Sequence, residues 1–219
     1  MDAEQAFKYI ETCGLMAGLR GHFPPDTALR VAEVLMSEGI IVFEMTMNSD
    51  RALEAMQAVK RAFGDDACVG MGTVLDVAQA RQALEAGANF VVSPAFSPAV
   101  VREVQAADVL VAPGVITPTE CVEAWALGAR LLKLFPIGPL GVEYLQAIRG
   151  PLDHMKFMCN GGTSDLNVGE FLKAGAVACG LGSWLTGDGH MPLDTIRDRA
   201  RRLRQIVRAL QTGVSGQTV

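Results

Sequence analysis

The chain has 219 residues, half of them hydrophobic, so it can bury the core of a single domain of ordinary size. Its formal net charge of −5 and its isoelectric point near 5.2 argue against a nucleic-acid-binding surface, which needs a basic face. No apolar run is long enough to span a membrane, and residues 1–5 lack the basic and then apolar order of a signal peptide. We therefore expect a cytoplasmic protein with no nucleic-acid or membrane partner.

Short apolar runs alternate with helix-period segments along the chain, after a leading helix over residues 2–12. Eight runs have the length and composition of buried parallel strands: residues 15–19, 40–46, 68–72, 90–93, 109–112, 131–135, 156–159 and 177–180. The segments between them have the 3.6-residue period of helices, and several end at a glycine. Strand then helix, repeated eight times, predicts a single (β/α)8 TIM barrel over residues 1–211, with the leading helix covering its floor.

The C-terminal part of the chain is predicted to form a last helix over residues 195–210, with an apolar stripe on one side. Its six arginines are interpreted as a solvated face, given the acidic balance of the chain. Residues 212–219 are predicted to be a disordered tail.

The five cysteines and three histidines are scattered, and no pair of them has the spacing of a metal site or a redox motif. Three cysteines fall in apolar strands, where a thiol behaves as a small hydrophobic side chain. We therefore expect structural thiols, no metal ion and no cofactor.

Lys133 is a single ammonium group inside an apolar strand that ends at Pro136. Loss of water favours the neutral amine, which is the nucleophile that forms a Schiff base with a carbonyl substrate. The alternative is a lysine at a strand end whose charged group reaches solvent.

Glu44 is a carboxylate in the second predicted strand, and Lys133 lies in the sixth. Alternate strands of a barrel supply the same interior layers, so the two side chains are predicted to face each other across the barrel. A purely structural ion pair is the alternative, but buried pairs are poor stabilisers because desolvation offsets their attraction. We interpret Lys133 as the group that attacks a ketone and Glu44 as the general acid and base.

Glycine-rich turns follow the seventh and eighth strands, at Gly161-Gly162 and Gly182-Ser183. Turns at these positions of a barrel commonly bind phosphate through backbone N–H groups, although each turn could equally be an ordinary strand-to-helix connection. Arg20 and Thr73 end the first and third strands, where they could bind a carboxylate; a rim charge is the alternative for Arg20.

The order of these motifs resembles that of the 2-keto-3-deoxy-6-phosphogluconate / 4-hydroxy-2-oxoglutarate (KDPG/KHG) aldolase family. The resemblance runs over nearly the whole chain, and its markers are residues 17–21, 43–46, 70–75, 92–94, 112–115, 132–136, 161–162 and 180–183. It implies a metal-independent class I aldolase on a (β/α)8 barrel, assembled as a homotrimer.

The resemblance also assigns roles to individual residues. Lys133 matches the Schiff-base lysine and Glu44 the general acid and base, while Arg20 and Thr73 match residues that bind the substrate carboxylate. The phosphate site and the pocket walls match a further set of positions: Gly161, Gly162, Gly182 and Ser183 for phosphate, and Pro94 and Phe135 for the walls.

Two pocket positions depart from the common pattern of the family. Asn48 stands where many members have Arg, and Asn160 stands in place of the usual Thr before the Gly-Gly pair. Asn48, like the sequence Leu19-Arg20-Gly21, resembles the 2-keto-3-deoxy-6-phosphogalactonate branch. The expected substrate is a small keto acid, a 2-keto-3-deoxy-6-phospho sugar acid of the gluconate or galactonate type.

Three alternatives are kept open for the substrate and the class of protein. An aldolase for 4-hydroxy-2-oxoglutarate or for a non-phosphorylated 2-keto-3-deoxy sugar acid would use the same lysine. A metal-dependent pyruvate aldolase would need a cluster of His, Asp and Glu ligands, and a non-catalytic barrel that only binds a phosphorylated ligand would not need the Glu44–Lys133 pair.

Overall fold

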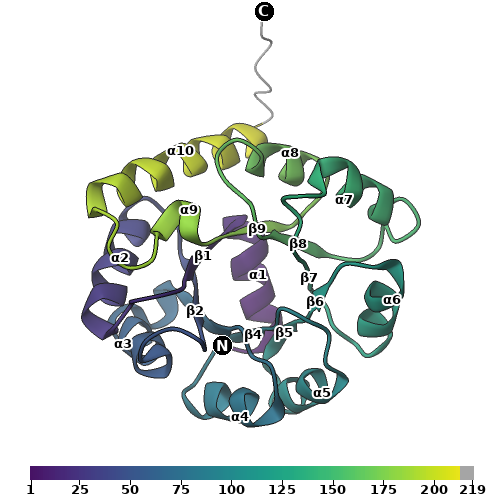
Figure 1. The fold of residues 1–219 in the computed structure, drawn as a ribbon, viewed down its shortest axis with the longest axis horizontal. Helices are drawn as coiled ribbons and strands as arrows, with labels where there is room; N and C mark the ends of the chain where they lie inside the picture. Colours follow the sequence, from purple (N-terminus) through teal and green to yellow (C-terminus); the bar gives the residue numbers. More distant parts are fainter. Residues whose placement is uncertain (213–219) are drawn as a thin grey trace, which may run out of the picture.

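A computed structural model describes residues 1–212 of the chain, and these residues form a parallel barrel surrounded by helices (Figure 1). The strands are β1 (Leu15–Leu19), β2 (Val42–Thr46), β3 (Cys68–Gly72), β4 (Phe90–Val92), β5 (Leu110–Ala112), β6 (Gly114–Val115), β7 (Leu132–Leu134), β8 (Phe157–Asn160) and β9 (Ala178–Leu181). Every strand pair in the sheet is parallel, as the strand–helix repeat predicts.

The predicted fifth strand is present as β5, and a further short strand, β6, follows it directly after Pro113; the two stand at the two ends of the sheet order. β5 pairs with β4, and β6 pairs with β7, so the two short strands together close the ring as one strand position. The Pro113 carbonyl accepts a 2.9 Å hydrogen bond from the Lys133 N–H, which continues the pairing across the break. Since β5 and β6 share one position, the nine labelled strands give the eight-membered barrel predicted from the sequence.

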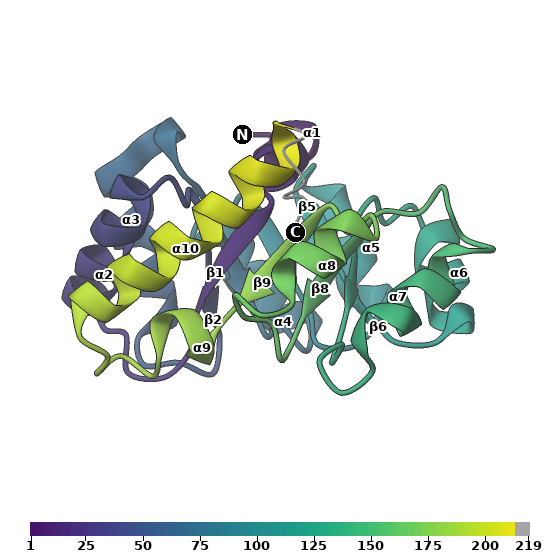
Figure 2. The same ribbon diagram turned by 90° about the horizontal axis from the view of Figure 1, so that it is seen from above.

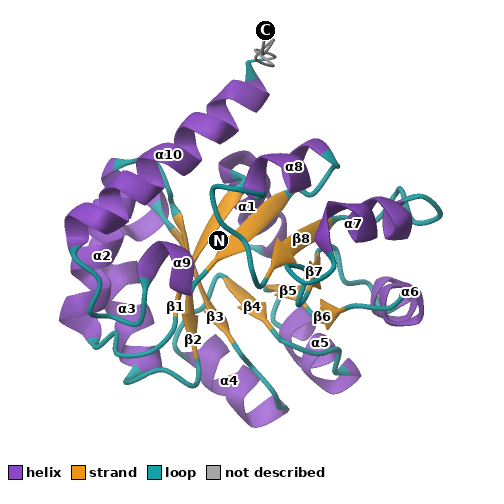
Figure 3. Ribbon diagram, turned by 45° about the horizontal axis from the view of Figure 1, so that its top comes forward, coloured by secondary structure: helices purple, strands orange, loops and turns teal. Residues whose placement is uncertain are grey.

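Helices follow each strand position and cover the outside of the barrel (Figure 3). In chain order they are α2 (Pro25–Ser37), α3 (Ala52–Phe63), α4 (Val77–Glu85), α5 (Pro98–Ala106), α6 (Pro118–Ala126), α7 (Gly141–Arg149), α8 (Val168–Lys173), α9 (Ser183–Thr186) and α10 (Leu193–Gln211); a short 3-10 turn, Gly64–Asp66, follows α3. Thr212, which the sequence assigns to the tail, caps α10, and the rest of that predicted tail lies outside the described residues.

Local sequence signals explain where several helices begin and end. In α6 the Thr117 hydroxyl accepts a bond from the Glu120 N–H, and the Glu120 carboxylate accepts one from the Thr117 N–H, a reciprocal capping box. α8 begins only at Val168, after its N-cap Asn167, several residues beyond the end of β8. The chain forms a tight turn first, because Asn167 Nδ2 donates to the Gly162 carbonyl.

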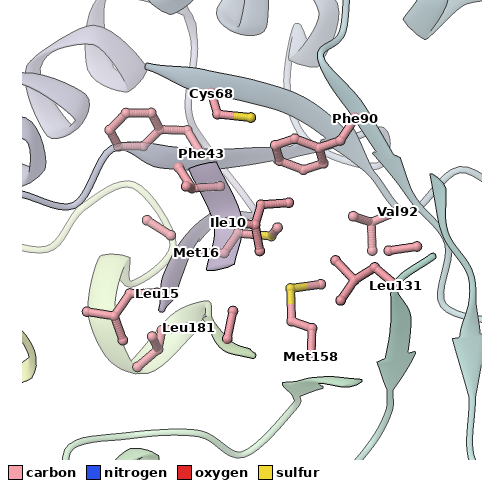
Figure 4. Packing of buried hydrophobic residues seen from close by; sticks show 14 of the residues in the cluster. Ile10, Leu15, Met16, Phe43, Cys68, Phe90, Val92, Leu131, Met158 and Leu181 are labelled. Carbon is pink, nitrogen blue, oxygen red and sulfur yellow. The ribbon is translucent and has the colours of Figure 1, made fainter. Parts of the chain in front are cut away.

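The predicted leading helix is present as α1 (Ala3–Cys13), which lies across one end of the barrel, opposite α9 (Figure 2). Ile10 is fully buried and points into the barrel interior near Met16 (Figure 4). α1 therefore seals the N-terminal ends of the strands and leaves the opposite end free for a site.

Candidate active site

A cavity of about 480 Å³ opens at the C-terminal ends of the strands. Its walls come from β1, β2, β7, β8 and β9 and from the loops that follow them. Nine of the residues predicted for the site line it: Arg20, Glu44, Lys133, Phe135, Asn160, Gly161, Gly162, Gly182 and Ser183. The volume is that of a pocket for a small organic ligand.

Lys133 and Glu44 meet inside this cavity, as their places in even-numbered strands predicted. Lys133 Nζ lies 3.8 Å from Glu44 Oε1, and the two side chains are only 3% and 6% exposed. The lysine therefore does not reach solvent, which removes the alternative of a strand-end charge. The separation is longer than a hydrogen bond, so a substrate oxygen can be bound between the two groups.

The surroundings of the pair restrict both side chains. Glu44 Oε1 is buried and has no hydrogen-bond partner among the described residues. Gly72, opposite Thr46 in the neighbouring strand, leaves room for the carboxylate: a Cβ there would lie 2.5 Å from Glu44 Cδ. The ring centroid of Phe135 lies 4.9 Å from Lys133 Nζ. An unpartnered carboxylate oxygen facing an amine is suited to moving protons on a bound substrate.

The two glycine turns form the wall of the cavity next to Asn160. Gly161 and Gly162 have positive φ angles of 83° and 85°, which only glycine adopts without strain. The Thr163 hydroxyl donates a 2.5 Å bond to the Gly180 carbonyl, so the turn after β8 is tied to β9. The backbone at Gly182 borders open space, with no atom within 4 Å of the place of a Cβ. The two turns thus present backbone to one side of the cavity.

Asn160 and Arg20 bring polar groups to the same cavity. Asn160 is 5% exposed, and its Oδ1 has no hydrogen-bond partner within residues 1–212. Its amide occupies the space left by Gly180 in the adjacent strand, because a Cβ there would lie 2.6 Å from Asn160 Cγ. Arg20 is exposed at the end of β1, and no ion pair involves it in the described part of the chain. The cavity thus combines a cation at its edge with an orphaned amide inside.

Three predicted site residues, Thr73, Pro94 and Asn48, do not line the cavity. Asn48 is exposed, in the turn where the Thr46 and Ser49 hydroxyls bond to each other at 2.7 Å. Thr73 has a left-handed backbone with φ of 57°, and both Thr73 and Pro94 are partly exposed on the β3 and β4 side of the mouth.

Several lining residues were not predicted: Gly18, Thr46, Thr163, Ser164, Gly180, Leu181, Trp184, Gly187 and Asp188. Thr46 could have been found, since it shares a strand face with Glu44. Asp188 could not have been found from the sequence, because a contact between two distant loops brings it to the cavity. In that contact the Asp188 carbonyl accepts a 2.7 Å bond from the His22 N–H.

Several cysteines are buried in the described part of the chain. Burial raises the pKa of Cys68 and of Cys159 to about 12 and that of Cys121 to about 11. Within residues 1–212, no three His, Cys, Asp or Glu side chains form a group that could hold a metal ion. No helix in this part of the chain has the length and apolarity needed to cross a membrane.

Comparisons with known proteins identify relatives over most of the chain. The family profile described as KDPG and KHG aldolase matches residues 22–197. The probable 2-dehydro-3-deoxy-6-phosphogalactonate aldolase of Rhizobium meliloti (strain 1021) is 34% identical over 187 residues, 85% of this chain and 87% of the relative.

Two solved structures agree with that relationship. The native KDPGal structure has a TM-score of 0.85 at 30% identity and covers 90% of this chain and 96% of its own. The KDPG aldolase of Legionella pneumophila, with pyruvate captured at low pH as a covalent carbinolamine intermediate, has a TM-score of 0.78 at 26% identity, covering 93% and 97%. The chain therefore belongs to the KDPG and KHG aldolase family.

Proposed function

We propose that this protein is a class I aldolase that reversibly cleaves a 2-keto-3-deoxy-6-phospho sugar acid to pyruvate and glyceraldehyde 3-phosphate. The observation that carries the proposal is the buried Lys133–Glu44 pair, 3.8 Å apart inside a cavity of substrate size. The carbinolamine described for the Legionella pneumophila relative supports the same chemistry.

The cleavage begins when the neutral Lys133 amine attacks the C2 ketone and forms a carbinolamine. Loss of water gives a protonated Schiff base, which withdraws electrons from the C3–C4 bond. Glu44 takes the proton of the C4 hydroxyl, the C3–C4 bond breaks, and its electron pair forms an enamine while the aldehyde leaves. Protonation of the enamine at C3 and addition of water then release pyruvate and restore the amine.

The charged ends of the substrate would be bound at different parts of the cavity. Arg20 offers a guanidinium that would bind the carboxylate of the substrate. Thr73 is proposed to contact the same carboxylate when substrate is bound. The backbone of the Gly161-Gly162 and Gly182-Ser183 turns would hold the phosphate. Phe135 would form a wall beside the Schiff base, with Pro94 and Asn48 at the mouth.

Asn160 is proposed to recognise a substrate hydroxyl. A buried acceptor without a partner costs free energy until a donor reaches it, and its Oδ1 is such an acceptor in the cavity wall. A hydroxyl of a sugar acid can supply that donor. This favours a polyhydroxylated substrate over 4-hydroxy-2-oxoglutarate, which ends in a carboxylate and carries a single hydroxyl.

Trapping with borohydride in the presence of pyruvate tests the mechanism. A stable added mass is expected on a peptide that contains Lys133, and Lys133→Met should remove both the adduct and the activity. The matched control is Lys156→Met, since Lys156 is exposed and outside the cavity. An adduct on another peptide, or a Lys133→Met protein with full activity, would contradict the proposal.

The substrate is tested by pyruvate release from the phosphogluconate-type and phosphogalactonate-type compounds, each with and without its phosphate. We expect phosphorylation to lower KM, and one C4 epimer to be preferred. Glu44→Gln should still form the pyruvate adduct but lose about 10²–10⁴-fold in cleavage rate.

The setting of the enzyme is proposed from the resemblance and the sequence: a homotrimer that works in the cytoplasm. Light scattering after size-exclusion chromatography should give three times 23.3 kDa. A mass of one or two chains would refute the trimer, and cell fractionation would test the location.

A further inference from the structure

α10 carries a row of arginines that the sequence presents as a solvated face. In the structure this helix runs along the outside of the barrel between α2 and α8, with α9 lying between it and β1 (Figure 1). α9 begins at Ser183, directly after Gly182, so α10 lies behind one of the two turns proposed to hold phosphate.

The side chain of Arg199 in α10 contacts both the main chain and the side chain of Trp184, which follows this turn. Its guanidinium donates a hydrogen bond to the Trp184 carbonyl, and Cζ lies 5.1 Å from the centre of the Trp184 ring. The same Nη1 lies 3.6 Å from Sδ of Met191, beyond the loop that follows α9. Trp184 lines the cavity, so Arg199 fixes a wall of the site without belonging to it.

No carboxylate within residues 1–212 forms an ion pair with Arg199. Among residues 1–212, the ion pairs of α10 involve Arg197, Arg201 and Arg202, and none involves Arg199. If Arg199 only attached α10 to the barrel, an ion pair with a carboxylate would stabilise that contact more than a bond to a carbonyl and a contact with a ring. The unpaired cation instead stands behind an anion-binding wall, where it favours negative charge in the cavity.

Arg202 extends the same arrangement to the other turn. It lies about one helical turn after Arg199 and places Nη1 3.3 Å from Oδ2 of Asp165. Asp165 follows Ser164, which lines the cavity after the Gly161-Gly162 turn. Because the Arg202 side chain is 56% exposed, its pair is expected to contribute little. One helix thus contacts the segments that follow both turns, at Trp184 and at Asp165.

We propose that α10 positions the phosphate end of the active site, with Arg199 as its main positioning residue and Arg202 as a minor one. The inference rests on the proposed function, since it assigns the two turns to the phosphate of the substrate. Arg199 affects affinity for the phosphorylated end through Trp184, while the amine of Lys133 works independently of it.

Kinetics of Arg199→Met test the proposal, with pyruvate trapping as the second readout. We expect KM for the phosphorylated substrate to rise about tenfold, with kcat and the rate of pyruvate adduct formation unchanged, since pyruvate has no phosphate. Arg199→Lys keeps one donor and the charge, so it should recover part of the affinity. Arg202→Met should change KM about twofold. Arg201→Met is the matched control, because Arg201 pairs with Glu38 of α2 at 2.9 Å, away from both turns, and should change nothing.

Tryptophan fluorescence gives a test that does not depend on turnover. The chain has two tryptophans, so Trp125→Phe leaves Trp184 as the only indole. Titration with inorganic phosphate should change its emission with saturation, and the half-saturating concentration should be about tenfold higher with Arg199→Met added.

The proposal is overturned if Arg199→Met leaves KM and the phosphate titration unchanged, or if it slows pyruvate adduct formation as much as it weakens affinity, because the residue would then be merely structural. Should Arg199→Met not fold, Arg199→Lys decides by the same two measurements. A protein that cleaves no phosphorylated keto acid but still binds phosphate in an Arg199-dependent way would refute the proposed function and keep this inference.

Discussion

Replacing Gly72 of β3 by alanine would place a methyl group in the space that the Glu44 side chain occupies. The new Cβ would lie 2.5 Å from Glu44 Cδ and 2.6 Å from Cγ, whereas ordinary contacts begin near 3.4 Å. Oε1 of Glu44 would lie closer still to the new Cβ, so the carboxylate would have to move by at least about 1 Å. Since Gly72 is not among the glycines with positive φ, the backbone accepts alanine and the effect is confined to this contact.

A displacement of this size should separate the general base from its substrate. Misplacement by about 1 Å can cost about 100-fold in rate, so we expect kcat of Gly72→Ala to fall by about two orders of magnitude. Overpacking typically costs about 1–3 kcal/mol, which leaves the protein folded if its stability is ordinary. Pyruvate release should be measured together with the thermal midpoint, so that lost activity is not confused with unfolding.

Two variants make the reasoning refutable. Gly150→Ala is the control, because its Cβ would make only ordinary contacts, 3.5 Å from the Ala147 carbonyl and 3.8 Å from the Gln146 carbonyl, and its kcat should be unchanged. Glu44→Asp shortens the carboxylate, so adding it to Gly72→Ala should cost less than it does alone, a coupling that a double-mutant cycle measures. A Gly72→Ala enzyme with kcat near the parent value, or additive effects in the cycle, would refute the placement of Glu44.

Three further predictions concern groups outside the catalytic pair. Thr186→Val should lower the free energy of unfolding by about 1–3 kcal/mol in urea titrations, because it removes the 2.7 Å bond to the buried Gly18 carbonyl; Thr186→Ser should restore it. Hydrogen bonds from the Ile116 N–H, and then from Thr117, hold the pKa of the Glu120 carboxyl below its ordinary 4.5. The stability it adds is therefore present above that value and lost as pH falls through the folded pKa, and Glu120→Gln should unfold with a weaker acid dependence in that range. Four buried thiols have a raised pKa: Cys68, Cys121, Cys159 and Cys179. They should resist a disulfide reagent at about pH 8 in the folded protein and react only after unfolding, whereas an exposed thiol of ordinary pKa would react at once.

The strands and the pairing of Lys133 with Glu44 could be predicted because each depends on local pattern. A parallel barrel buries both faces of its strands, so a short apolar run identifies a strand, and a charged residue within one is conspicuous: all five residues of β2 are buried, Glu44 included. Strand parity then places Glu44 and Lys133 face to face. The short strand β6 was not predicted, because Pro113 lacks an N–H for the ladder and so marks the end of a strand in the sequence. Its carbonyl nevertheless accepts a bond from the Lys133 N–H, and the pairing continues beyond it.

The rim of the cavity could not be predicted in the same way, since loop contacts join residues far apart in sequence. Gly21 and Gly189 allow two loops to touch: a Cβ on Gly21 would lie 2.6 Å from the Asp188 carbonyl oxygen. Nothing in the local sequence indicates this contact. Asn48, which the family resemblance assigns to the pocket, is exposed in the turn after β2 and does not line the cavity, so its role stays a prediction.

The reactive end of this barrel differs from its core in the size of the residues that face inwards. Met16 and Met158 fill the interior at the level of the core (Figure 4), and two residues further along the same strands stand Gly18 and Asn160. At this upper level, glycines in neighbouring strands leave the space that Glu44 and Asn160 occupy. Glycines at this level make fewer packing contacts than larger side chains would, which lowers stability. Burying the Lys133–Glu44 pair adds little stability to offset that loss. A barrel built for stability alone would fill this layer with apolar side chains, so its glycines and unpartnered oxygens are best explained by the chemistry of a bound substrate.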